Sequence, residues 1–234
     1  MIRSIAVVPH PPLLVPELVG AAADEMEPLR TACQQAVRAL RVPRWYAVGA
    51  DDAGPTVVPA GAVGSFRGYG MDVPVTLGVR PSGVPVTALP LLVAGWLGGQ
   101  AGADTIVGEL VHPLTPTGDC LARGQRLVAE LAGDWSLVVL ADGASTHAAP
   151  GAGRVDERAA GFDAAVATAL ATADADALAD LDAGLAAQLG AQGRAAWQVL
   201  AGVARGAGTR WTPELLYTGA PYGVGYHVAI WQAS

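Results

Sequence analysis

The chain alternates between short, continuous apolar runs and longer segments whose apolar residues recur every three or four positions. The short runs predict strands at 5–8, 44–50, 73–79 and 135–143, with two more inside 213–231. The longer segments predict helices at 16–41, 87–99, 117–133 and 193–206, with two more inside 155–189 that break near 173–174. Residues 53–72 are rich in glycine and proline, which predicts loops with a short hairpin.

Strands separated by helices of this length are typical of an α/β fold. Linkers, charge blocks and repeats do not divide the chain. We therefore predict a single α/β domain over residues 1–234, built as a central mixed or parallel sheet flanked by helices.

The composition favours a soluble protein with a tightly packed core. The hydrophobic content is 52% and the mean hydropathy is +0.36, and much of this comes from small residues. The longest apolar stretch, at 87–99, is too short to span a bilayer and is interrupted by Pro90. His10 and three prolines interrupt the N-terminal run where a signal peptide would need an apolar segment. We expect a cytoplasmic protein with no membrane partner.

Charge and cysteine content exclude some functions. The net charge of −7 argues against nucleic acid as a partner, because such surfaces need clustered positive charge. All 14 basic residues are arginine, which excludes a Schiff-base or phosphate-binding lysine. Cys33 and Cys120 lie far apart without a partner motif, so we expect reduced, buried structural thiols.

Polar side chains follow three of the predicted strands. His10 follows the first strand, Asp51 and Asp52 follow the second, and His147 follows the strand at 135–143. In an open α/β sheet, ligands bind at the carboxyl ends of the strands. The prolines around His10 restrict its backbone and so aim the imidazole, as a metal ligand or a general base requires.

Ordinary structural roles are the alternative for each of these residues. A histidine beside prolines can bind a backbone carbonyl, and Asp51 and Asp52 before a glycine can form a turn through their carboxylates. We expect His112 and His227 to be structural. Common zinc motifs are absent from the sequence, and "GASTH" at 143–147 lacks the final glycine of a nucleophile elbow.

Several stretches together resemble the catalytic subunit of the class III extradiol ring-cleavage dioxygenases (LigB-type). They are the early strand ending in His-Pro, "VVLADGASTHAAPG" at 138–151, "FDAAVATALATADADALADL" at 162–181, the Trp197, Leu200 and Gly202 pattern, and "APYGVGYHVAIW" at 220–231. The likeness follows the order of elements over nearly the whole chain and is greatest to small, divergent members of actinobacterial type. It implies a LigB-like fold, allows a homodimer, and implies a small aromatic substrate.

The resemblance also implies a ferrous iron, or another divalent metal, held by two histidines and one carboxylate. His10 matches the first iron ligand, and His147 matches the acid–base histidine. The second histidine is expected after the second strand, where this chain has Asp51 and Asp52, so these become the candidate substitutes. The family's glutamate is expected about one turn before Trp197, where the chain reads Gln192, Gly193 and Arg194.

Three functions stay open. The first is a metal-dependent oxidoreductase in which His10 with Asp51 or Asp52 holds the metal and His147 moves protons. The second is a degenerate, non-catalytic member that binds a small molecule or a protein. The third is a metal-free hydrolase or lyase that uses His10 and His147 as an acid–base pair, with Ser145 or Thr146 as a nearby hydroxyl.

Overall fold

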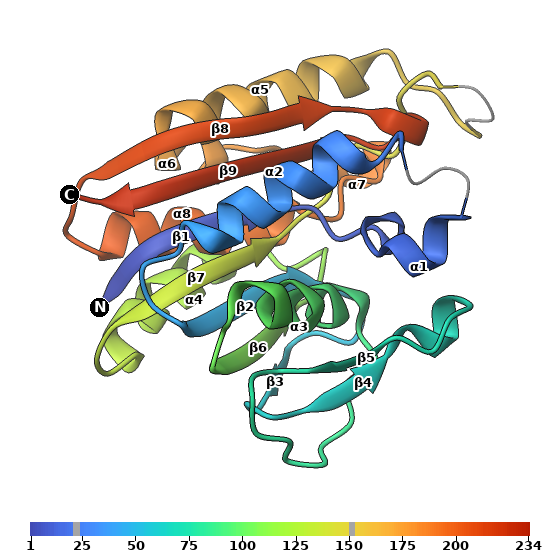
Figure 1. Cartoon of the computed structure of the whole chain (residues 1–234). Helices are drawn as coiled ribbons and strands as arrows, with labels where there is room; N and C mark the ends of the chain where they lie inside the picture. The colour runs from blue at the N-terminus through green and yellow to red at the C-terminus, as the bar shows by residue number, and fades with distance from the viewer. Residues whose placement is uncertain (21–23, 150–152) are drawn as a thin grey trace.

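A mixed sheet lies at the centre of the computed structural model, which describes residues 1–20, 24–149 and 153–234 (Figure 1). Its strands are β1 (Ile2–Val8), β2 (Arg44–Ala50), β3 (Thr56–Val58), β6 (Thr105–Val111), β7 (Trp135–Leu140), β8 (Trp211–Gly219) and β9 (Tyr226–Ala233). These seven strands pair in the order β3-β6-β2-β7-β1-β9-β8. Strands β6, β2, β7 and β1 run parallel, and the other pairs are antiparallel. A small hairpin joins β4 (Val63–Ser65) to β5 (Pro74–Thr76).

Helices cover both faces of the sheet. They are α1 (Pro16–Val19), α2 (Glu27–Arg38), α3 (Leu89–Ala101), α4 (Thr117–Glu130), α5 (Arg158–Thr172), α6 (Ala175–Ala179), α7 (Ala183–Leu189) and α8 (Arg194–Gly206). Helices α2 and α3 lie on one face, and α4 and α8 lie on the other (Figure 1). This arrangement confirms the predicted α/β class with a mixed sheet flanked by helices.

The core has two layers because alternate residues of the central strands face opposite sides of the sheet. In β1, Ile5 and Val7 pack in the layer with α4, α5 and α8, whereas Ala6 and Val8 pack in the layer with α2 and α3. A strand covered on both faces is apolar at every position rather than at alternate positions. This explains why the run at 5–8 predicts a strand without any alternation.

The structure differs from the predicted elements in several places. Strand β3 lies inside the segment 53–72 that was predicted as loops with a hairpin, and the predicted strand at 73–79 is the shorter β5, which pairs with β4 in a separate small sheet. Strand β6 was not predicted, and its Glu109 is buried, bonded by Tyr46 and Arg123. The predicted helix at 16–41 is two helices, α1 and α2, and its residues 21–23 lie outside the described residues. The segment 155–189 holds three helices rather than two. The predicted break is confirmed at Ala173, which has a left-handed backbone, and Asp174, which caps α6.

Candidate functional site

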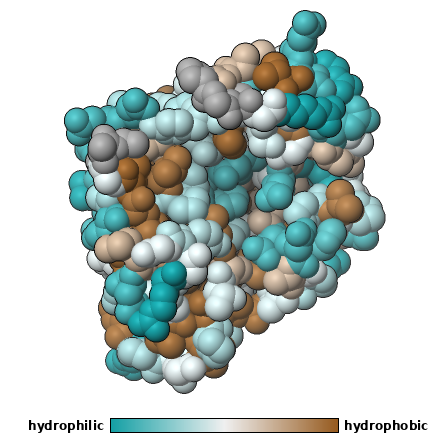
Figure 2. All heavy atoms as spheres, turned by 90° about the vertical axis from the view of Figure 1, so that its right-hand side faces the viewer, coloured by the Kyte–Doolittle hydropathy of each residue, from teal (hydrophilic) through white to brown (hydrophobic). Residues whose placement is uncertain are grey.

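The carboxyl ends of the parallel strands place four polar residues along one edge of the sheet. His112 directly follows β6, Asp51 directly follows β2, and Asp142 and His10 lie two residues beyond β7 and β1. The strand order therefore sets the sequence His112, Asp51, Asp142 and His10 across this edge. Figure 2 faces this side of the molecule, and hydrophilic residues line a hollow near its middle.

His10 is tied to the end of the neighbouring strand. Its backbone N–H donates to Asp142 Oδ1 at 2.8 Å, and its Nδ1 lies 3.5 Å from the same oxygen. His10 is 4% exposed, and within the described residues its Nδ1 has no hydrogen-bond partner. The prolines thus hold the imidazole in a buried position beside the carboxylate of Asp142. Sequence reasoning did not single out Asp142.

Asp51 and Asp52 serve the turn that follows β2. Asp51 Oδ1 accepts the backbone N–H of Ala53 at 2.8 Å, and the Asp51 N–H donates to the carbonyl of Val111 at 3.0 Å. The Asp52 side chain is 90% exposed, and its Oδ1 lies 3.9 Å from His112 Nε2. The turn that was the structural alternative for these residues is present.

The predicted iron ligands do not form a cluster. In the ranges 1–20, 24–149 and 153–234, no three His, Cys, Asp or Glu side chains are arranged to hold a metal ion. His10 faces Asp142, Asp51 caps its own turn, and Asp52 extends beside His112. This donor set does not fit the expected iron site, so the metal stays a prediction of the resemblance.

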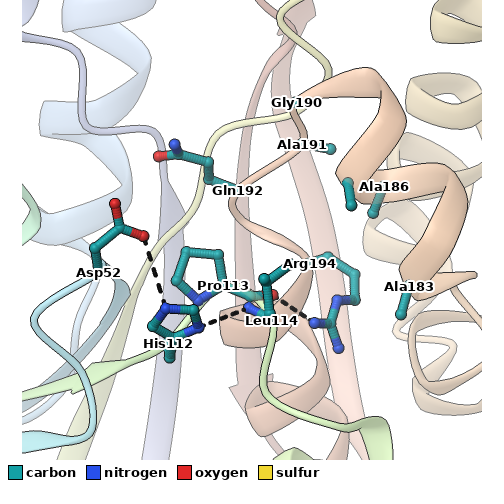
Figure 3. A pocket seen from close by; sticks show the side chains of 11 residues that line it. Asp52, His112, Pro113, Leu114, Ala183, Ala186, Gly190, Ala191, Gln192 and Arg194 are labelled. Atoms are coloured by element: carbon teal, nitrogen blue, oxygen red, sulfur yellow. Dashed lines mark hydrogen bonds and ion pairs between the residues drawn. The ribbon is translucent and has the colours of Figure 1, made fainter.

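A cavity of about 500 Å³ opens beside Asp52 and His112. Figure 3 shows these two side chains on one side of it and α7, with Ala183 and Ala186, on the other. Arg194 also lines this cavity, but its guanidinium is buried and donates to the carbonyls of Pro113 and Thr115 and to Gln198 Oε1. Its positive charge is therefore committed to holding the chain after β6.

His147 belongs to a different cluster, on the face covered by α5. His147 Nε2 lies 2.5 Å from Asp163 Oδ2, and His227 Nε2 lies 3.4 Å from Asp163 Oδ1. The other His227 nitrogen, Nδ1, lies 3.0 Å from the hydroxyl of Thr218. Asp163 comes from α5 and His227 from β9, so three separate elements meet in this cluster.

Two glycines make room for the Asp163 carboxylate. A Cβ atom on Gly143 would lie 2.3 Å from Asp163 Oδ1, and one on Gly225 would lie 1.8 Å from Asp163 Oδ2. The Gly143 N–H donates to the Gly225 carbonyl at 2.7 Å, which joins the end of β7 to the start of β9. Any larger side chain at either position would displace the carboxylate from the histidines.

The hydrogen bonds of Asp163 assign the proton positions around it. The backbone N–H of Ala144 points to both carboxylate oxygens, at 3.2 and 3.3 Å, so Asp163 acts as an acceptor. His147 then donates from Nε2, which leaves its Nδ1 as an unprotonated nitrogen when the ring is neutral. The side chain of His147 is 15% exposed and lines a cavity of about 390 Å³, together with Thr218 and small residues of α5. This arrangement can take a proton from a bound molecule.

The structure brings His147 together with residues that the sequence did not single out. Asp163 lies within a helical pattern where a single carboxylate is ordinary, and His227 lies within a strand pattern where it was expected to be structural. The predicted partners His10 and His147 share no hydrogen bond or ion pair among the described interactions. Ser145 and Thr146 both direct their hydroxyls to the Leu189 carbonyl, at 3.5 and 3.4 Å.

Comparisons with known proteins bear on the fold. No family model matches the sequence, and no curated protein matches it. The structure is similar to the crystal structure of an uncharacterised protein, JW3007, from Escherichia coli K12. The TM-score is 0.51 and the sequence identity is 13%, over 98% of this chain and 99% of that chain. At this identity the likeness shows the fold alone, so the resemblance to the LigB-type dioxygenases stays a prediction.

Among the helices in residues 1–20, 24–149 and 153–234, none is both long enough and apolar enough to cross a bilayer.

Proposed function

We propose that the chain is an enzyme in which His147 takes a proton either from a small-molecule substrate or from a water molecule that attacks this substrate. The observation that carries this proposal is the 2.5 Å contact between His147 Nε2 and Asp163 Oδ2 beside an open cavity. A carboxylate that holds one imidazole nitrogen fixes the orientation of the ring and leaves the other nitrogen to act on a substrate. A hydrolase and a lyase both use such a base.

The cavity beside His147 suits a small ligand. Its volume of about 390 Å³ lies in the lower part of the range that small-molecule sites occupy. Besides the side chains of the His147 cluster, Thr218 lines it as a polar residue. The rest of the lining consists of small residues: Ala160, Ala164, Ala167, Gly219 and Ala220. A compact or planar molecule with one polar group near His147 matches these walls.

The proposal retains the metal-free alternative but changes the residues that carry it. His147 pairs with Asp163, which also contacts His227, rather than with His10. The iron-dependent alternative has less support, because Asp51 caps a turn and Asp52 extends into solvent. A non-catalytic role, in which the cluster only stabilises the fold, predicts equal activity for the wild type and a folded His147→Gln variant.

The test measures hydrolysis of p-nitrophenyl acetate by the wild-type chain and by His147→Gln. In this reaction His147 Nδ1 takes a proton from water, the hydroxide adds to the acetyl carbonyl carbon, and p-nitrophenolate leaves with the electron pair of the broken C–O bond. Loss of a general base lowers kcat/KM about 100-fold or more. Asp163→Asn should lower it by a similar factor, because it disturbs the tautomer of His147.

His112→Gln is the matched control, because it removes a histidine from the same edge without touching the cluster. Its kcat/KM should equal that of the wild type. A second probe, exchange of the α-hydrogens of cyclohexanone in D₂O, reports proton abstraction without a leaving group, as a lyase requires. Equal rates for wild type and a folded His147→Gln variant with both probes would contradict the proposal.

A further inference from the structure

Another cavity lies on the opposite face of the sheet from the His147 cluster. Tyr226 of β9 lines this cavity, whereas the next residue, His227, belongs to the cluster. Successive residues of a strand face opposite sides of a sheet. The cavity has a volume of about 280 Å³. Its polar lining includes Asp142 and Gln192, and its apolar lining includes Pro12, Leu89 and Val224.

Asp142 brings a negative charge to this cavity without a matching positive charge. Its side chain is only 20% exposed. In the part of the chain that the structure describes, its only ion-pair neighbour is His10, whose Nδ1 lies at 3.5 Å without a hydrogen bond. Asp142 Oδ1 accepts the backbone N–H of His10, and no hydrogen bond within the same ranges reaches Oδ2. A poorly hydrated carboxylate of this kind is stabilised by a cation that binds against it.

The phenol of Tyr226 is held in its neutral form beside this carboxylate. Burial raises the pKa of Tyr226 well above its usual value, and the negative charge of Asp142 raises it further. Burial and the same charge also raise the pKa of the Cys33 thiol. Neither group therefore adds negative charge at neutral pH, and Tyr226 remains a hydrogen-bond donor.

Among the described residues, no arginine forms an ion pair with Asp142. Arg194, which lines the cavity beside His112 and Asp52, is buried and donates to the carbonyls of Pro113 and Thr115. Asp51 and Asp52 add further carboxylates to the same edge. The charges of the edge thus favour a cationic ligand over an anionic one.

We infer that the cavity beside Asp142 binds a small primary ammonium compound with an apolar body. The ammonium pairs with the Asp142 carboxylate, and the apolar body packs against Pro12, Leu89 and Val224. This inference goes beyond the proposed function, because it needs neither His147 nor a reaction. It also gives a role to the stiff segment after β1, which forms one wall of the cavity.

The experiment titrates the protein with cyclohexylammonium chloride and follows backbone amide shifts by NMR. We expect saturable shifts at Gly143, Val224 and Tyr226. Loss of a charge-assisted contact weakens binding about tenfold or more in Asp142→Asn. The asparagine oxygen can still accept the His10 N–H, so the fold should be retained. Cyclohexanol and cyclohexanecarboxylate, which have the same ring, should bind far more weakly.

Asp52→Asn is the matched control, because it removes the same charge from the same edge outside this cavity. Its affinity should equal that of the wild type. A second variant, Val224→Trp, fills the cavity while keeping Asp142 and should also abolish binding. Equal weakening in Asp142→Asn and Asp52→Asn, equal affinity for cyclohexanol, or no saturable shift in the wild type would overturn the inference. His147→Gln should bind the probe normally, so the two proposals fail separately.

Discussion

Two groups of histidines and aspartates lie near the same edge of the sheet and are connected in different ways. In the His147 group, the Asp163 carboxylate contacts the side chains of both His147 and His227. In the group after β1, β2 and β7, the carboxylates of Asp51 and Asp142 each accept a backbone N–H. The end of a strand therefore places a polar residue at an edge, but a second element must supply its side-chain partner.

The two groups also differ in burial. The Asp163 side chain is 8% exposed, whereas that of Asp52 is 90% exposed. Electrostatic contacts are stronger where water is excluded, so the same type of residue has unequal importance at the two places. Variants at each place make this difference measurable.

Asp163→Ala should have the largest effect on stability. It leaves His147 Nε2 and the Ala144 N–H without their acceptor and removes the carboxylate that faces the buried His227 Nε2 at 3.4 Å. Unsatisfied buried groups of this kind cost about 3 kcal/mol of unfolding free energy. Urea denaturation measures the loss, and a loss no larger than that of Asp51→Ala would show that the cluster is not specially stabilised.

Gly225→Ala should destabilise the chain less, while disturbing the same cluster. The added Cβ would lie 1.8 Å from Asp163 Oδ2, and overpacking of this kind costs about 2 kcal/mol. Hydrolysis of p-nitrophenyl acetate should fall with it, because the carboxylate moves. Gly161→Ala in α5 is the matched control, since a Cβ there meets no atom within 4 Å. A Gly225→Ala variant with wild-type stability and activity would contradict the assigned geometry.

The aspartates after β2 should have small effects. Asp51→Ala loses the bond to the Ala53 N–H and about 1 kcal/mol of unfolding free energy. Asp52→Ala should leave the denaturation midpoint unchanged, because its 3.9 Å contact with His112 is exposed. A larger loss of unfolding free energy for Asp52→Ala than for Asp51→Ala would contradict these assignments.

The reactivity of the two cysteine thiols measures whether the core excludes solvent and reagent. Burial raises the pKa of Cys120 to about 11 and raises that of Cys33 further. Only the thiolate reacts with a disulfide reagent, so at pH 8 the folded wild type should show almost no labelling and the urea-unfolded chain should react at both thiols. Rapid labelling of the native chain would contradict the burial of these residues.

The sequence predicted much of the framework because central strands and long helices have strong local patterns. The strand at 44–50 has the bounds of β2, and the helix at 193–206 differs from α8 by one residue. Strand β6 was missed because Gly108 and Glu109 interrupt its apolar run. Glu109 is acceptable there because Tyr46 and Arg123 bind it, and these residues come from β2 and α4.

The candidate site was predicted only in part, for a similar reason. His147 was singled out by its place after a strong strand, but Asp163 has no distinctive local pattern. Its burial depends on Gly143 and Gly225, which lie far from it in sequence and leave space for its carboxylate. Local periodicity cannot show such a space, because three separate elements create it.

The tautomer of His147, measured by ¹⁵N NMR of the imidazole nitrogens, tests most directly whether Asp163 orients this ring as a base. In the neutral ring the proton should lie on Nε2, held by the bond to Asp163, and Nδ1 should be unprotonated. In Asp163→Asn this preference should weaken or reverse. A wild-type ring protonated on Nδ1, or nitrogen shifts unchanged in Asp163→Asn, would contradict the claim that Asp163 prepares His147 as a base.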